Sequence, residues 1–137
     1  MSEESTTPDL VKLFQQNIEA VNRGDLDAYL SVYAPDAVLQ TGVGRFVGRD
    51  SIRGYLEDLW GSYDELVFAL DEFHDLGNGV AFCALEATGR LCGASFEVHL
   101  RYAVVVTHVE GVFARATDYV NIDEARAAAE RLAQERG

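Results

Sequence analysis

Three ionisable side chains in the second half of the chain have the types and spacing that proton transfer needs. His99 and Arg101 lie two residues apart in an apolar stretch, 95–108, so they share one face if that stretch is a strand. Asp118 lies in the next stretch, 112–121, with two alanines on the same parity that leave room beside it. If the three converge in an apolar pocket, Arg101 holds Asp118 ionised and lowers its pKa, Asp118 is the acid/base, and His99 relays a proton.

The same residues also have structural interpretations. An Arg–Asp pair on neighbouring strands often only joins the strands, and a lone histidine is commonly a hydrogen-bonded wall residue. Several aromatic residues could line the mouth of the same pocket, although aromatic side chains at helical spacing are also ordinary core residues. These are Tyr29, Tyr33, Tyr55 and Trp60. The sequence leaves both interpretations open.

Charge and composition restrict the class of protein. The chain has 137 residues, enough for one domain, and 11 Lys and Arg face 23 Asp and Glu, for a net charge of −12. This balance disfavours nucleic acids and anionic membrane surfaces as partners. The first residues are acidic and polar and no long apolar run follows, so we expect a cytoplasmic protein.

Metal and cofactor chemistry has no recognisable motif in this chain. Cys83 and Cys92 are too few for a disulfide framework, and we expect both to be buried free thiols. No CxxC, HExxH or phosphate-binding glycine loop occurs. We therefore expect no metal site and no cofactor.

Hydrophobic periodicity predicts an α+β framework that would position the three ionisable groups. Residues 1–7 are expected to be a disordered tail, and 8–137 a single domain. Predicted helices cover 8–23, 25–34, 51–61 and 123–135, and predicted strands cover 37–41, 45–47, 64–75, 79–90, 95–108 and 112–121. Turn residues at 75–79 and 109–111 link the later strands closely, which predicts an antiparallel meander.

Four short stretches, in this order, resemble the SnoaL-like proteins of the nuclear transport factor 2-like superfamily. They are Asn-Arg-Gly-Asp-Leu-Asp at 22–27, Tyr-Ala-Pro-Asp-Ala-Val at 33–38, Phe-Val-Gly-Arg-Asp-Ser-Ile at 46–52 and Asp-Tyr-Val-Asn at 118–121. The resemblance covers about 8–135. It implies a strongly bent antiparallel sheet that forms a cone, N-terminal helices that close a pocket, and a C-terminal helix.

The enzymes of this superfamily suggest which chemistry to expect. Ketosteroid isomerases use three groups whose positions here carry Asn17, Thr41 and Ala103, so that mechanism is absent. Limonene epoxide hydrolases use an Arg-x-Asp and a second Asp; Arg101 and Asp118 match, but Ala103 replaces the intervening acid. Polyketide cyclases of the SnoaL type need one acid in the pocket, which Asp118 supplies. The comparison places the odd-numbered face of 95–108 toward the cavity.

We therefore predict a cofactor-independent acid/base enzyme of cyclase, isomerase or dehydratase type, acting on a small, mostly apolar carbonyl compound, with Asp118, Arg101 and His99 as its catalytic residues. A non-catalytic ligand-binding or dimeric interaction domain and an epoxide hydrolase are the alternatives. The expected pocket lining is Asn17, Tyr29, Tyr33, Thr41, Tyr55, Trp60, Ala103 and Ala116. The even-numbered face of 95–108 is an apolar row, which favours a homodimer formed through the sheet.

Overall fold

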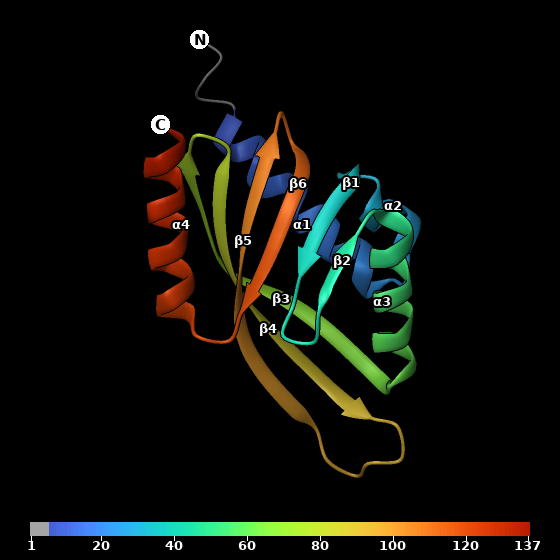
Figure 1. Cartoon of the computed structure of the whole chain (residues 1–137). Coiled ribbons are helices and arrows are strands. Elements are labelled where there is room, and N and C mark those ends of the chain that lie inside the picture. The colour runs from blue at the N-terminus through green and yellow to red at the C-terminus, as the bar shows by residue number, and fades with distance from the viewer. Residues whose placement is uncertain (1–5) are drawn as a thin grey trace.

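The computed structural model describes residues 6–137, which form four helices and six strands (Figure 1). In chain order the elements are α1 (Thr6–Asn22), α2 (Leu26–Leu30), β1 (Tyr33–Gln40), β2 (Arg45–Val47), α3 (Arg49–Gly61), β3 (Tyr63–Gly77), β4 (Val80–Leu91), β5 (Val98–Val109), β6 (Val112–Tyr119) and α4 (Ile122–Arg136). The α+β class and the type of every predicted element are confirmed. Of the predicted tail, residues 1–5 lie outside the described residues, while Thr6 and Thr7 belong to α1.

The strands form one sheet in the order β2-β1-β6-β5-β4-β3. Neighbours are antiparallel except β1 and β6, which run parallel, so the predicted antiparallel sheet is in fact mixed. Parallel neighbours need a long connection, and here all of α3 and the β3–β5 meander separate the two strands in sequence. The sheet is open, with β2 and β3 at its edges.

Two tight turns hold the meander together. The β3–β4 turn consists of Asn78 and Gly79, with φ of 57° and 77°, and the β5–β6 turn of Glu110 and Gly111, with φ of 53° and 82°. Two successive left-handed residues are typical of a hairpin turn that matches the natural twist of strands. A Cβ at Gly79 would lie 2.7 Å from the carbonyl oxygen of His108, so this glycine also permits a close approach of two backbones.

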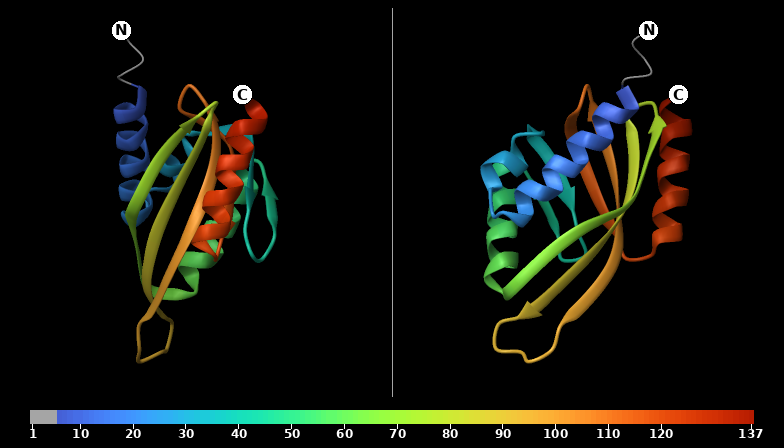
Figure 2. Two further views of the ribbon diagram at one scale, coloured as in Figure 1. Left: turned by 90° about the vertical axis from the view of Figure 1, so that its left-hand side faces the viewer. Right: turned by 180° about the vertical axis from the view of Figure 1, so that it is seen from behind.

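Helices cover the two faces of the sheet unequally. Residues of α1, α2 and α3 share a core with the concave face, including Leu10, Leu30 and Ile52. On the opposite, convex face, α4 packs its alanines Ala125 and Ala129 onto one end of β4 and β5. Figure 2 shows α1 and α4 on opposite sides of the strands, with the β4–β5 hairpin extending beyond both helices. The rest of the convex face is therefore exposed.

Two residues of the motif stretches connect helices to the sheet, and a third caps a helix. Asn22 exchanges two hydrogen bonds with the backbone of Phe68 in the edge strand β3, at 2.8 and 2.9 Å. Arg49 Nε donates to the carbonyl oxygen of Tyr33 at 2.9 Å. These two contacts tie α1 and α3 to the sheet. Asp25 accepts from the backbone of the first turn of α2, as expected for an N-cap.

Several local boundaries differ from the predictions. Helix α2 ends at Leu30 rather than at 34, because the carbonyl of Val32 accepts a hydrogen bond from Phe113 at 2.7 Å and the chain then enters β1. Helix α3 begins at Arg49 rather than at 51, and its N-cap is Gly48. Cys83 is buried as expected, but Cys92 is exposed.

No helix within residues 6–137 is both long and apolar enough to cross a membrane.

Candidate functional site

A cavity of about 370 Å³ lies between the concave face and helices α1–α3. This volume is within the range of sites that take small organic molecules. Seven of the residues predicted to line a pocket do so. They are Asn17, Tyr29, Tyr33, Thr41, Tyr55, Trp60 and Ala116. The remaining walls are almost entirely apolar or aromatic, including Phe14, Phe68 and Phe113.

Asp118 on β6 brings the cavity its one charged side chain among the described residues. It lies opposite Val104 of β5, and its half-buried carboxylate faces the cavity. Within residues 6–137 no cation or hydrogen-bond donor pairs with it, and burial raises its pKa from 3.8 to about 7. A partnered carboxylate with a lowered pKa was expected, and that expectation is wrong because Arg101 does not reach the cavity.

Four tyrosines from different elements line the same cavity as this carboxylate. The hydroxyl groups of Tyr29 on α2 and Tyr33 on β1 are 2.9 Å apart. Burial raises the pKa of Tyr29 to about 12 and that of Tyr33 well above its ordinary value, and burial followed by the Asp118 charge raises those of Tyr55 and Tyr102. All four hydroxyls are therefore protonated donors near neutral pH. Asn17 supports this cluster by donating to the carbonyl oxygen of Tyr29 at 2.9 Å.

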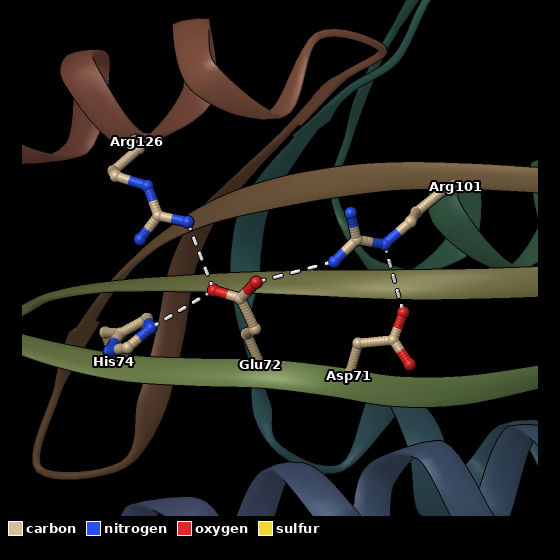
Figure 3. A network of polar contacts seen from close by, with 5 residues as sticks. All are labelled: Asp71, Glu72, His74, Arg101 and Arg126. Atoms are coloured by element: carbon tan, nitrogen blue, oxygen red, sulfur yellow. Dashed lines mark hydrogen bonds and ion pairs between the residues drawn. The ribbon is translucent and has the colours of Figure 1, made fainter.

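Arg101 and His99 lie on the convex face, outside the cavity. Arg101 Nε is 3.2 Å from Asp71 Oδ2, and its Nη2 is 3.4 Å from Glu72 Oε2. Figure 3 shows this network, in which Arg126 of α4 and His74 also contact Glu72, at 3.1 and 3.3 Å. The predicted convergence of these two residues with Asp118 is therefore wrong.

His99 is equally remote from the cavity. Its side chain is 62% exposed, and its Nε2 lies 3.5 Å from Glu97 Oε1 on the same face. Its other ring nitrogen lies 3.4 Å from the hydroxyl of Thr88 on β4. Ala103, predicted to line the pocket, is also on the convex side, fully buried beneath α4. The whole odd-numbered row of β5 thus faces away from the ligand site.

A β-bulge explains this reversal. Next to the β5–β6 turn, Val109 pairs with Val112 and His108 with Phe113, a register that would place Asp118 opposite Ala103. The register then shifts by one residue, so that Asp118 lies opposite Val104. One extra residue in a strand exchanges its faces relative to its neighbour, because side chains alternate with period 2.

The apolar even-numbered row of β5 is consequently the cavity wall. Leu100, Tyr102, Val104 and Val106 line the cavity. The interpretation of this row as a dimer interface is wrong. The apolar row therefore no longer supports the expectation of a homodimer. Alternation was the signal that could have found these residues, because an apolar row beside a polar row normally faces the interior.

Metal binding has no candidate cluster in the described part of the chain. No group of three or more His, Cys, Asp or Glu side chains there is arranged to hold an ion. Cys83 faces the cavity near Asp118, and burial raises the pKa of its thiol to about 12, which keeps it protonated and unreactive. The chemistry of this cavity therefore depends on Asp118 and the tyrosine hydroxyls.

A bent sheet with helices enclosing a cavity on its concave face defines the nuclear transport factor 2-like fold. The SnoaL-like domain model matches residues 14–130. The chain therefore belongs to the SnoaL-like domain family. No curated protein matches its sequence.

Solved structures with the same fold share little sequence with this chain. A proposed polyketide cyclase from Sinorhizobium meliloti has a TM-score of 0.66 at 23% identity, over 81% of this chain and 94% of its own. A protein with a ketosteroid isomerase-like fold from Catenulispora acidiphila, in complex with trimethylamine, has a TM-score of 0.73 at 14% identity, over 89% of this chain and 92% of its own. TerC, co-crystallised with polyporic acid, has a TM-score of 0.71 at 16% identity, over 89% and 98%.

Proposed function

We propose that this protein is a cofactor-independent acid/base enzyme of cyclase, isomerase or dehydratase type, acting on a small, mostly apolar carbonyl compound, with Asp118 as the proton-transfer group. One observation carries this proposal. Among the described residues, Asp118 is the one carboxylate that lines this apolar cavity, and burial raises its pKa to about 7. A general acid/base is most effective when its pKa lies near the working pH, because both protonation states are then available.

The proposed reaction begins with the ionised form of Asp118. A carboxylate oxygen removes a proton from the carbon next to the ligand's carbonyl group, and the C–H electron pair moves to give an enolate. The neutral Asp118 then returns the proton, to the same carbon, to another carbon, or to a hydroxyl group that leaves as water. Removing that carboxylate would leave the tyrosines, whose raised pKa values keep them in the neutral phenol form, which cannot remove the proton.

Arg101 lies outside the cavity and tyrosine hydroxyls line it, so the tyrosines are the donors that stabilise the charge developing on the ligand. An enolate oxygen needs donors that already point to where its charge develops. The Tyr29–Tyr33 pair and Tyr102 line the same cavity as the carboxylate that would remove the proton. Their apolar surroundings lower the local dielectric constant, which strengthens each hydrogen bond to the developing charge.

The geometry disfavours one rival function, epoxide opening, and is compatible with the other, ligand binding without catalysis. Epoxide opening of the hydrolase type requires Arg101 beside Asp118, and Arg101 is bound to Asp71 on the other face. A purely ligand-binding role would use the same cavity, and the relatives that carry trimethylamine and polyporic acid support small-molecule binding by this fold. The raised pKa of Asp118 favours proton transfer over binding alone.

Hydrogen–deuterium exchange tests the proton transfer without knowledge of the natural substrate. The probe is 2-tetralone, a small apolar ketone with acidic protons next to its carbonyl, followed by NMR in deuterated buffer. The protein should accelerate loss of the C1 proton signal, with a rate that rises as pH increases through about 7. Asp118→Asn should lower the enzymatic rate by roughly 10²–10⁴-fold.

Asp71→Asn is the matched control, because it makes the same chemical change on the convex face. It should exchange 2-tetralone at the parent rate. Equal rates for Asp118→Asn and the parent protein would contradict the assignment of Asp118. Binding of 2-tetralone without any exchange above buffer would favour the ligand-binding alternative.

A further inference from the structure

The charges around the cavity are strongly one-sided. Of the described residues that line it, none is Arg, Lys or His, and Asp118 is the one acid. Arg101 of β5 and Arg126 of α4 are held by acids on the convex face. An anionic ligand would therefore meet a carboxylate and no compensating cation, which is unfavourable in an apolar site.

A half-buried carboxylate without a partner can be neutralised by a proton or by a cation that enters the cavity. The lining of the cavity suits the second possibility. Tyr29, Tyr33, Tyr55 and Tyr102 line the same cavity as Asp118, and Trp60 and Phe68 form a tilted ring pair in it, with centroids 5.6 Å apart. Aromatic rings attract cations through their faces, and they do so most strongly where water is excluded.

We infer that the cavity binds an apolar ligand that carries an alkylated ammonium group, with Asp118 as counterion and the surrounding aromatic rings as the walls of the cation site. The inference rests on the cavity being a ligand site, as in the proposed function, and is independent of proton transfer. An alkylated nitrogen suits this wall better than a primary amine or a guanidinium, because most of the lining side chains are aromatic or aliphatic and pack against alkyl groups.

The rim of the cavity indicates where the rest of the ligand lies. Three lining residues are also exposed apolar side chains, Val43 at 80%, Leu100 at 48% and Val120 at 78%. They come from the β1–β2 loop, from β5 and from the residue after β6. Apolar side chains at an opening favour a ligand whose hydrophobic body continues from the cation site to the mouth.

Such a ligand would also affect the proposed acid/base group. A cation beside Asp118 favours its ionised form, so binding would release a proton when the pH is below about 7. The other titratable groups that face Asp118 remain protonated in this range, since burial raises the pKa of each. They are Tyr29 on α2, Tyr33 on β1, Tyr55 on α3, Cys83 on β4 and Tyr102 on β5.

A pair of probes with the same shape and different charge tests this inference. Phenyltrimethylammonium and tert-butylbenzene differ by one positive charge, and neither titrates. Trp60 is the one tryptophan of the chain and lines the cavity, so its fluorescence reports binding. At pH 8 the cation should bind at least tenfold more tightly than the neutral probe, and its affinity should fall as the pH is lowered through 7, while that of tert-butylbenzene stays constant.

Asp118→Asn should abolish the preference for the cation and retain binding of tert-butylbenzene, which shows that the cavity is intact. Asp71→Asn, with the same change on the convex face, should behave like the parent protein. Equal or tighter binding of tert-butylbenzene by the parent at pH 8 would overturn the inference, as would a cation preference that survives in Asp118→Asn. Exchange of 2-tetralone tests the proposed proton transfer separately. If exchange is observed but the cation preference is not, the inference fails and the proposed function stands.

Discussion

Asp71 and Glu72 on the convex face and Asp118 on the concave face carry the same carboxyl group in opposite surroundings. On the convex face, hydrogen bonds from Arg126 and then His74 lower the pKa of Glu72, and Arg101 contacts both acids. On the concave face, burial without a partner raises the pKa of Asp118 to about 7. The two faces of one sheet therefore separate ion pairs that connect elements from a carboxylate that is available to a ligand.

This separation has a thermodynamic consequence. Paired charges on an exposed face cost the fold little, because water and counterions share in their solvation. An ionised carboxylate in an apolar cavity lowers the stability of the folded state, and a natural sequence retains such a group most readily when it has a function. Three sets of substitutions test the comparison, in order of decreasing expected effect on the free energy of unfolding.

The largest effect should come from Asp118→Asn. The folded pKa of Asp118, about 7, lies above its ordinary value of 3.8, so the folded state binds this proton more tightly than the unfolded chain does. The resulting stabilisation is complete below 3.8 and is lost as the pH rises through 7. At pH 8 the asparagine variant should therefore be more stable than the parent, by on the order of 4 kcal/mol.

Urea unfolding at pH 4 and pH 8 measures this difference. At pH 4 the two proteins should have nearly the same free energy of unfolding, because Asp118 is then largely neutral in the folded parent. A variant that is less stable than the parent at pH 8 would mean that Asp118 has a stabilising partner in solution.

The second test compares two alanines that the sequence had placed in the same pocket. Ala103 is fully buried beneath α4, whereas Ala116 borders the cavity. Ala103→Leu should overpack the α4 interface and destabilise the protein by about 1–3 kcal/mol. Ala116→Leu has free space in front of it and should change the stability by less than about 1 kcal/mol, while weakening binding of 2-tetralone. Thermal unfolding and Trp60 fluorescence measure both quantities, and equal destabilisation by the two variants would contradict the assignment of faces.

The smallest effect should come from Arg101→Gln. Its side chain is 48% exposed, and pairs of this kind usually contribute less than about 1 kcal/mol to stability. The change should be smaller still at high salt, which screens exposed charges. Exchange of 2-tetralone should continue at the parent rate. If a folded Arg101→Gln variant lost more than tenfold in exchange rate, Arg101 would be a catalytic residue, which would contradict its position outside the cavity.

Local sequence signals were sufficient for most of the framework. The helices and the two tight turns follow from residue types within a few positions of each other, and the structure contains each of them. The motif residues Asn22 and Arg49 are explained by backbone groups that they bind across long distances in the chain. Asp118 was also recognisable, since an acid that shares one face of a strand with two alanines is typical of a pocket wall.

Only the tertiary structure decided which groups accompany Asp118. Because of the extra residue between the β5–β6 turn and Asp118, Asp118 lies opposite Val104 rather than Ala103. As a result Tyr102 faces the cavity, and Arg101 and His99 do not. A sequence shows the alternation along each strand, but the register between strands depends on long-range packing and on bulges. Composition and local spacing thus determined that one acid would lie in an apolar pocket, while the register determined that no cation of the described chain would lie beside it.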